Sequence, residues 1–204
     1  MNKQRGFSLV ELLVILGILG LLVGVSIPAL TSLSKGADLG SAGKSVTGQL
    51  ELARQTATAR NLWIELRIYE TMNRSGKKFY NSLALFSVGE DEDGDGQPDE
   101  FRPEGRVVGL PRGVVFMPSG EYSTLISEAP QSGQASIPST RDANYVAFRF
   151  KPDGSVSLEA KPISGSSWTL TLVAEKDVEA SVLPADYVRI SLSPQIGTTQ
   201  LSRP

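Results

Sequence analysis

The sequence contains neither cysteine nor histidine among its 204 residues. Without cysteine there are no disulfide bonds and no thiol chemistry. Without histidine the chain lacks the most common general base and metal ligand, so Ser-His-Asp and Cys-His nucleophile systems are excluded. The formal net charge of −2 argues against a general affinity for nucleic acid. We therefore expect neither an enzyme nor a general nucleic-acid-binding protein.

The chain does contain one long apolar run at its start. The run extends from Phe7 to Ile27, follows a basic leader with Lys3 and Arg5, and carries a single charge, Glu11. A hydrocarbon core about 30 Å thick needs roughly 20 apolar helical residues, so the run predicts a transmembrane helix. A cleaved secretory signal is the competing interpretation, but its apolar region usually has only about 7–15 residues.

Glu11 is the unusual residue of this run. A carboxylate near the bilayer centre costs about 2.5–3.5 kcal/mol on insertion scales, so an intramembrane Glu predicts a function. Glu11 lies close to one end of the run, where snorkelling reduces this cost. The competing interpretation is therefore an interfacial residue with no special role.

The segment Gly6-Phe7-Ser8-Leu9-Val10-Glu11-Leu12-Leu13 resembles the type IV prepilin signature, which pilins share with the pseudopilins of type II secretion systems. The resemblance implies that a prepilin peptidase removes residues 1–6 by cutting after Gly6, and that Phe7 becomes an N-methylated N-terminus. It also implies that Glu11 pairs with the Phe7 amine of a neighbouring subunit during assembly. An unpaired charge in an apolar bundle would cost several kcal/mol, so such a pair can set the register between subunits.

A second helical pattern follows the apolar segment 7–34. Apolar residues recur at helical spacing at Val46, Leu50, Ala53 and Ala57, so residues 35–60 predict an amphipathic helix that packs on a sheet and ends at Asn61. Four glycines between residues 36 and 48 each weaken a helix by about 1 kcal/mol. We expect either a frayed helix or a hinge there.

From residue 61 to residue 204 the chain reads as an antiparallel β domain. Ile64, Leu66 and Ile68 alternate with other residues, which predicts a half-buried strand. Residues 127–144, rich in Ser, Pro, Gly and Gln, predict an exposed loop. Further strands are expected at 79–88, 113–117, 168–173, 187–192 and, as an edge strand, within 193–204. A hairpin of 145–150 and 155–159 is expected around the turn Lys151-Pro152-Asp153-Gly154.

The chain resembles the H-type minor pseudopilins and related minor pilins in the order of three features. These are the segment LELARQTATARN, then a strand, then the segment FRFKPDGSVSL. The ending VRISLSPQIGTTQLSRP also resembles a pseudopilin-like cassette family whose members end in an Arg-Pro segment. Together these resemblances imply the α+β pilin-like fold, in which a long N-terminal transmembrane helix precedes an antiparallel β-sheet domain.

The same resemblance implies a minor pseudopilin, a structural subunit of a type II secretion-like periplasmic pseudopilus. It would cross the bacterial inner membrane once, with a cytoplasmic N-terminus and a periplasmic C-terminal domain. Its partners would be other major and minor pseudopilins, the prepilin peptidase and the inner-membrane assembly platform. The alternative is a minor type IV pilin that binds DNA for uptake. A surface cluster of the late basic residues would favour that alternative: Arg141, Arg149, Lys151, Arg189 and Arg203.

An acidic stretch, residues 89–100, is the one metal-like motif. Its carboxylates recur at the first, third, fifth and ninth places of a calcium loop, and Gly96 occupies the sixth, where the backbone turns sharply. The twelfth place is Arg102 instead of the usual Glu, and Glu100 is a substitute ligand. Calcium with a stabilising role is one interpretation, and a solvated acidic turn is the other. The candidate ligands are Asp91, Asp93, Asp95, Gln97, Asp99 and Glu100.

The prepilin resemblance predicts a defined mature N-terminus. Mass spectrometry of the protein extracted from membranes should show a chain that starts at N-methylated Phe7, because the Gly6-Phe7 junction lies five residues ahead of Glu11. A chain that still starts at Met1, or one cut near Ser26, in cells that contain the peptidase would contradict this expectation.

Overall fold

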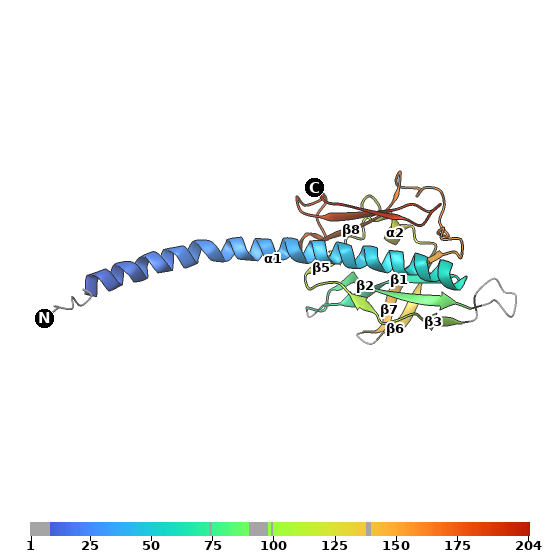
Figure 1. Ribbon diagram of the computed structural model, residues 1–204, viewed down its shortest axis with the longest axis horizontal. Helices are drawn as coiled ribbons and strands as arrows, with labels where there is room; N and C mark the ends of the chain where they lie inside the picture. Colours follow the sequence, from blue (N-terminus) through green and yellow to red (C-terminus); the bar gives the residue numbers. More distant parts are fainter. Residues whose placement is uncertain (1–8, 74, 90–97, 99, 138–139) are drawn as a thin grey trace. The chain divides into compact units, whose positions relative to one another are not determined.

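The computed structural model describes residues 9–73, 75–89, 98, 100–137 and 140–204, and only the backbone of residues 23–35, 140 and 141. The chain divides into two compact units, Met1–Ala37 and Asp38–Pro204. Helix α1, Leu9–Arg60, supplies the described part of the first unit and the beginning of the second (Figure 1). Asn61, with φ of 52°, ends α1 as predicted, since a left-handed residue commonly follows a helix.

The expected frayed helix or hinge at residues 36–48 is wrong, because the backbone is helical throughout this stretch. The glycines cost about 1 kcal/mol each. Against this, Leu39, Val46 and Leu50 are fully or almost fully buried, and each gains about 1.5–3 kcal/mol from burial. Packing of the apolar face therefore outweighs the weak helix propensity of the glycines.

The second unit contains two antiparallel sheets, which confirms the predicted α+β architecture of an N-terminal helix followed by an antiparallel β domain. The first sheet has the order β3-β2-β1-β7-β6, and β4 also pairs with β2. Its strands are β1 (Ile64–Met72), β2 (Lys78–Val88), β3 (Phe101–Pro103), β4 (Val108–Gly109), β6 (Gln131–Ile137) and β7 (Thr140–Phe150). The second sheet has the order β10-β9-β8-β5. Its strands are β5 (Val114–Phe116), β8 (Trp168–Ala174), β9 (Val188–Leu192) and β10 (Thr199–Ser202).

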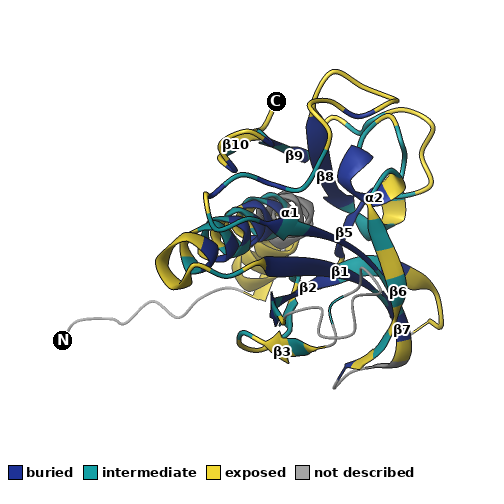
Figure 2. Ribbon diagram, turned by 90° about the vertical axis from the view of Figure 1, so that its right-hand side faces the viewer, coloured by how far each residue is buried: buried dark blue, intermediate teal, exposed yellow. Residues whose placement is uncertain are grey.

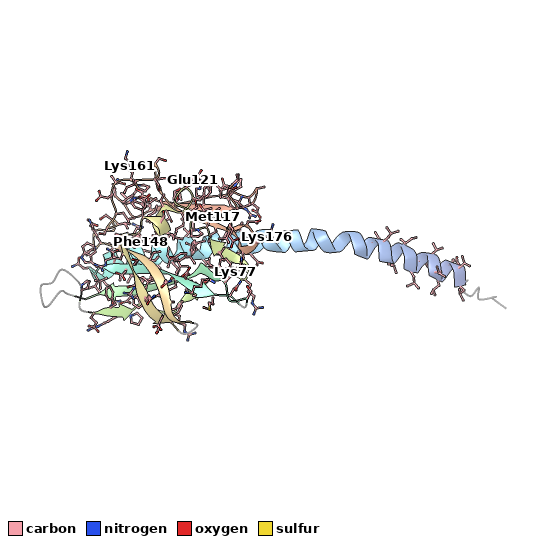
Figure 3. The ribbon with its side chains drawn as sticks, turned by 180° about the vertical axis from the view of Figure 1, so that it is seen from behind. Lys77, Met117, Glu121, Phe148, Lys161 and Lys176 are labelled. Atoms are coloured by element: carbon pink, nitrogen blue, oxygen red, sulfur yellow. The ribbon has the colours of Figure 1, made fainter. Side chains whose placement is uncertain are left out.

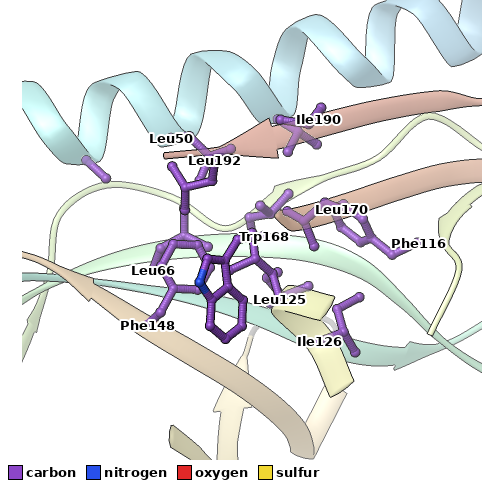
Figure 4. Packing of buried hydrophobic residues seen from close by; sticks show 14 of the residues in the cluster. Leu50, Leu66, Phe116, Leu125, Ile126, Phe148, Trp168, Leu170, Ile190 and Leu192 are labelled. Atoms are coloured by element: carbon purple, nitrogen blue, oxygen red, sulfur yellow. The ribbon is translucent and has the colours of Figure 1, made fainter. Parts of the chain in front are cut away.

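One hydrophobic core joins α1 to both sheets. It contains Leu50 and Ala53 of α1, Leu66 and Phe148 of the first sheet, and Ile190 of the second (Figure 4). An end view shows this part of α1 between the two sheets (Figure 2). Trp168 closes the core with 3% of its surface exposed, and its indole Nε1 donates a hydrogen bond to the Glu159 carbonyl oxygen at 2.9 Å. The helix is therefore the layer on which both sheets depend.

Two stretches differ from the sequence prediction. Residues 127–144 are not one exposed loop, because they form β6 and the start of β7, which pair in an antiparallel ribbon. The turn at Pro152-Asp153-Gly154 is present, and Lys151 N donates to Ser155 O across it. The predicted hairpin is reduced to a single antiparallel bridge between Phe150 and Val156, with Ser157 N donating to Arg149 O at 2.8 Å, and Val156 N bonds to Pro194 O beside the second sheet.

Side-chain hydroxyls close one edge of β8. The short helix α2, Thr124–Ser127, lies where the three-residue strand β5 leaves β8 unpaired. The Ser123 hydroxyl oxygen accepts a hydrogen bond from Thr171 N at 2.9 Å, and that of Thr124 accepts one from Thr169 N at 2.8 Å. Buried backbone N–H groups must find a partner, and here two hydroxyls take the place of a neighbouring strand.

The packing of α1 predicts opposite effects for two glycine substitutions. A Cβ at Gly43 would lie 2.7 Å from Val188 Cγ1 and 3.0 Å from Leu201 Cδ1, whereas a Cβ at Gly48 meets nothing within 4 Å. Urea denaturation of a fragment that begins at Lys35 should show Gly48→Ala raising the free energy of unfolding by roughly 0.5–1 kcal/mol. Gly43→Ala should lower it by up to about 2 kcal/mol, because overpacking outweighs the better propensity. Equal stabilisation by both would contradict this packing.

Candidate functional site

The predicted processing and assembly residues lie at the start of the chain. Gly6 and Phe7 fall outside the described residues, so their roles stay predictions. Glu11 lies in the first turn of α1 as the structure describes it, and its side chain is exposed. A carboxylate in the first turn interacts favourably with the positive end of the helix dipole.

The described part of the first unit exposes apolar side chains all around the helix. Between Leu9 and Leu22, eleven Leu, Ile and Val side chains are 45–79% exposed. A helix that is apolar on every side requires apolar surroundings, either lipid or other helices. No helix in the described part of the chain is both long enough and apolar enough to span a membrane.

The acidic stretch joins two neighbouring strands. Of its candidate ligands, only Glu100 belongs to the described residues, and Asp91, Asp93, Asp95, Gln97 and Asp99 lie outside them. The base of this connection is closed by the pairing of β2 with β3 and by a hydrogen bond of 2.8 Å from Gly89 N to Glu100 O. The two ends of the acidic stretch are therefore held side by side.

Glu100 is engaged with Arg102, the residue at the twelfth loop position. Arg102 Nε lies 2.8 Å from Glu100 Oε1, and its Nη2 lies 2.7 Å from Oε2. This bidentate hydrogen bonding lowers the pKa of Glu100. Within the described residues no group of three or more acidic side chains is placed to hold a metal ion. To act as a calcium ligand, Glu100 would have to share its oxygens with Arg102 or release it.

The sequence prediction missed a buried ionic cluster on β1 and β7. Glu65 is only 1% exposed and Arg67 only 6%. The Glu65 carboxylate accepts hydrogen bonds from Arg67 Nε at 2.6 Å and from Arg149 Nε at 2.8 Å. The strand predicted from residue 64 onward is confirmed as β1, but the expectation that it is half-buried is wrong, because β1 is buried on both faces.

Three aromatic rings surround the Arg67 guanidinium. Its central carbon lies 4.3 Å from the ring centre of Phe86, 4.5 Å from that of Phe101 and 4.4 Å from that of Tyr145. Desolvation works to lower the pKa of Arg67, but the hydrogen bond and charge of Glu65 raise it, and the net shift is upward. The charged cluster thus fixes Phe101, the first residue of β3, against β1 and holds the end of the acidic stretch.

The late basic residues do not all present free charge. Arg149 is bonded to Glu65, and Arg203 Nη2 lies 2.8 Å from Asp186 Oδ1. Lys151 Nζ lies 6.0 Å from the ring centre of Trp63, which is 40% exposed. Arg189 lies over Tyr187, and the side chain of Arg141 is outside the described residues. Two of the four described cations are therefore balanced by carboxylates.

Comparisons with known proteins place the N-terminal segment in a defined class. Residues 1–27 match the model of the prokaryotic N-terminal methylation motif. A methylation motif at the head of an apolar helix, followed by an antiparallel β domain, is an arrangement similar to that of type IV pilins and pseudopilins.

The chain is similar to one curated protein and to one solved structure. The chain is 38% identical over 66 residues to the pilin-like protein PilA1 of Thermus thermophilus, a match that covers 32% of this chain. It thus spans about two fifths (41%) of that relative's length. The minor pseudopilin EpsH from the type 2 secretion system of Vibrio cholerae aligns with a TM-score of 0.43 and 11% identity, covering 82% of this chain and 98% of EpsH.

The buried cluster predicts a strong and specific stability effect. Glu65→Gln should lower the free energy of unfolding by about 3–5 kcal/mol, because it leaves the buried guanidinium of Arg67 and the half-buried one of Arg149 without a carboxylate. The control is Glu179→Gln, which removes the carboxylate partner of Lys77 (labelled in Figure 3); both side chains of this pair are exposed. This exposed pair should contribute less than about 1 kcal/mol. Similar losses for the two variants in urea denaturation would show that the Glu65 cluster has no special role.

Proposed function

We propose that the chain is a minor pseudopilin, a non-enzymatic structural subunit of a type II secretion-like pseudopilus that helps export proteins. The observation that carries this proposal is the match of residues 1–27 to the methylation motif, a segment that includes the start of a helix with apolar side chains exposed on all sides. Pilin-type assembly supplies the apolar surroundings that such a helix requires, first as lipid and then as neighbouring helices.

In this proposal the apolar segment anchors the chain in the bacterial inner membrane. Residues 1–6 would remain cytoplasmic until the prepilin peptidase removes them, and the unit that begins at Asp38 would lie in the periplasm. The basic leader supports this orientation, because cytoplasmic flanks carry an excess of Lys and Arg. The other partners would be major and minor pseudopilins and the inner-membrane assembly platform.

The DNA-uptake alternative receives less support from the described side chains. Nucleic-acid binding requires basic groups that are free to neutralise phosphates. The charges of Arg149 and Arg203 are balanced by Glu65 and Asp186. We therefore favour the secretion role.

We also propose that the acidic stretch binds calcium and orders itself by doing so. Support comes from the spacing of its carboxylates and from its closed base at Gly89 and Glu100. Oxygen ligands at this spacing suit Ca²⁺, and extracellular sites bind at roughly 10⁻⁴–10⁻³ M. The role would be structural, because loop carboxylates that repel one another without metal become compatible with it.

Calcium should raise the stability of the native state measurably. A tenfold excess over Kd adds roughly 1.4 kcal/mol. Thermal melting of the fragment from Lys35 should therefore shift upward in millimolar Ca²⁺ relative to EGTA, and less in Mg²⁺. Asp93→Ala should abolish the calcium-specific gain while leaving the melting temperature in EGTA unchanged or slightly higher. If Ca²⁺ and Mg²⁺ act alike, or if the variant responds as the wild type does, the stretch is only an acidic turn.

The charge of Glu11 should matter for assembly and not for folding. Glu11→Ala removes the carboxylate expected to pair with the Phe7 amine of a neighbour, while the unit Asp38–Pro204 keeps all its contacts. Incorporation into the filament, measured by shearing and immunoblotting, should fall, and the melting temperature of the β domain should not change. Leu12→Ala at the next position controls for a general loss of apolar contact. Normal incorporation of Glu11→Ala would favour the interfacial interpretation.

A further inference from the structure

A groove lies at the end of the second sheet where β8 begins and β9 turns into β10. It has a volume of about 340 Å³, which falls within the usual range of roughly 300–1,000 Å³ for ligand sites. Its buried lining residues are Trp168, Leu192 and Pro194. Of the twelve described residues that line it, none is charged and eight are Ser, Thr or Gln. The groove therefore offers hydrogen bonds but no charge of either sign.

One wall of the groove is the β8 loop, residues 159–167. The Glu128 carboxylate accepts hydrogen bonds from two successive backbone N–H groups in the middle of this loop, at 2.6 and 2.8 Å. At the start of the loop, the Glu159 carbonyl oxygen accepts the hydrogen bond from the Trp168 indole at 2.9 Å. The β8 loop is therefore fixed at its start and in its middle.

The other wall is the hairpin turn, residues 193–198, between β9 and β10. Gly197 has a φ of 63°, and a Cβ there would lie only 2.1 Å from the Gly154 carbonyl oxygen, so the turn packs tightly against the chain. Val156 N also donates a hydrogen bond to Pro194 O at 2.7 Å. Because both walls are held by contacts within the β domain, a ligand would not bear the cost of ordering them.

Most of the polar side chains in the groove have hydrogen-bonding capacity to spare. Elsewhere on this sheet hydroxyls are used within the chain, as those of Ser123 and Thr124 are at the edge of β8. In the described part of the chain, six polar side chains that line the groove form no such hydrogen bond: Ser166, Ser167, Ser191, Thr198, Thr199 and Gln200. Hydroxyl and amide groups both donate and accept, so together they can serve a ligand with groups of both kinds.

The backbone of the groove is largely occupied. Trp168, Leu192 and Thr199 form one row of paired residues across β8, β9 and β10, so recognition there depends on side chains. A charged ligand would lose hydration without gaining a counter-ion, and an apolar ligand would leave the hydroxyls without partners. The ligand that fits is uncharged and carries many groups that each donate and accept, as the hydroxyls of a sugar do.

We propose that this groove binds a neutral sugar unit of a glycan. The site belongs to the β domain alone and goes beyond the role proposed for the chain in a pseudopilus. Sugar binding is measured on the purified chain, whereas the Glu11 test measures incorporation into a filament. Failure of either test therefore leaves the other conclusion standing.

Isothermal titration calorimetry of the full-length chain tests the site. The chain is kept in an amine-oxide detergent, because detergents with sugar head groups would compete for the groove. The neutral probes are maltohexaose, cellohexaose and chitohexaose, and the acidic probe is hexagalacturonate. At least one neutral hexasaccharide should bind saturably at one site per chain. Hexagalacturonate should bind at least about tenfold more weakly than this sugar, because its carboxylates find no counter-ion in the groove.

Three variants locate the binding. Ser191→Ala and Gln200→Ala each remove a hydrogen-bonding group from the groove and should weaken binding roughly three- to tenfold, the contribution of one hydrogen bond. Ser202→Ala removes a hydroxyl from β10 outside the groove and should bind as the wild type does. All three side chains are exposed or partly exposed, so melting temperatures equal to that of the wild type confirm that folding is intact.

Tryptophan fluorescence gives an independent reading of the location. The chain contains two tryptophans, and Trp63→Phe leaves only Trp168, which lines the groove. A saturating concentration of the bound hexasaccharide should change the emission of this variant, and an unchanged emission would place the sugar elsewhere and overturn the proposal.

The remaining outcomes are equally decisive. Absence of saturable binding by all three neutral hexasaccharides would overturn the proposal, and so would wild-type affinity in both groove variants. Equal affinity for hexagalacturonate would contradict the requirement for a neutral ligand. Tighter binding of the uncharged peptide Ser-Gly-Ser-Gly-Ser-Gly than of any sugar would assign the groove to a polypeptide instead.

Discussion

Burial of one face of α1 between two sheets is the contact on which the β domain depends. Leu50, Ala53 and Ala57 are fully buried there, in the same core as residues of both sheets. The contact is close enough that Gly43 has no room for a Cβ against Val188. The two sheets share no strand, and they are joined both through the helix and by direct packing, as where Phe79 of β2 lies in one cluster with Val115 of β5.

The outer face of the first sheet is organised by a different interaction. Glu65 accepts hydrogen bonds from two arginines in an almost dry environment, and three aromatic rings enclose one of them. Such a cluster is costly to desolvate, but it becomes strongly directional once formed. The cluster therefore fixes the position of Phe101, the residue at which the chain leaves the acidic stretch and enters β3.

The β domain protects its strand edges in different ways. Hydroxyls of Ser123 and Thr124 replace a strand at β8, whereas β6 is flanked in the sequence by Pro130 and Pro138.

Local sequence patterns determined the elements with a clear period and the N-terminal motif. The helical stripe around Leu50, the paired strands at 168–173 and 187–192 and the α+β order followed from periodicity, and the segment around Gly6 and Glu11 followed from its specific pattern. The burial of Glu65, the strand at Gln131 and the unbroken helix through Gly43 were decided only by the tertiary structure. Each depends on partners distant in the chain, whose contacts override weak local propensities.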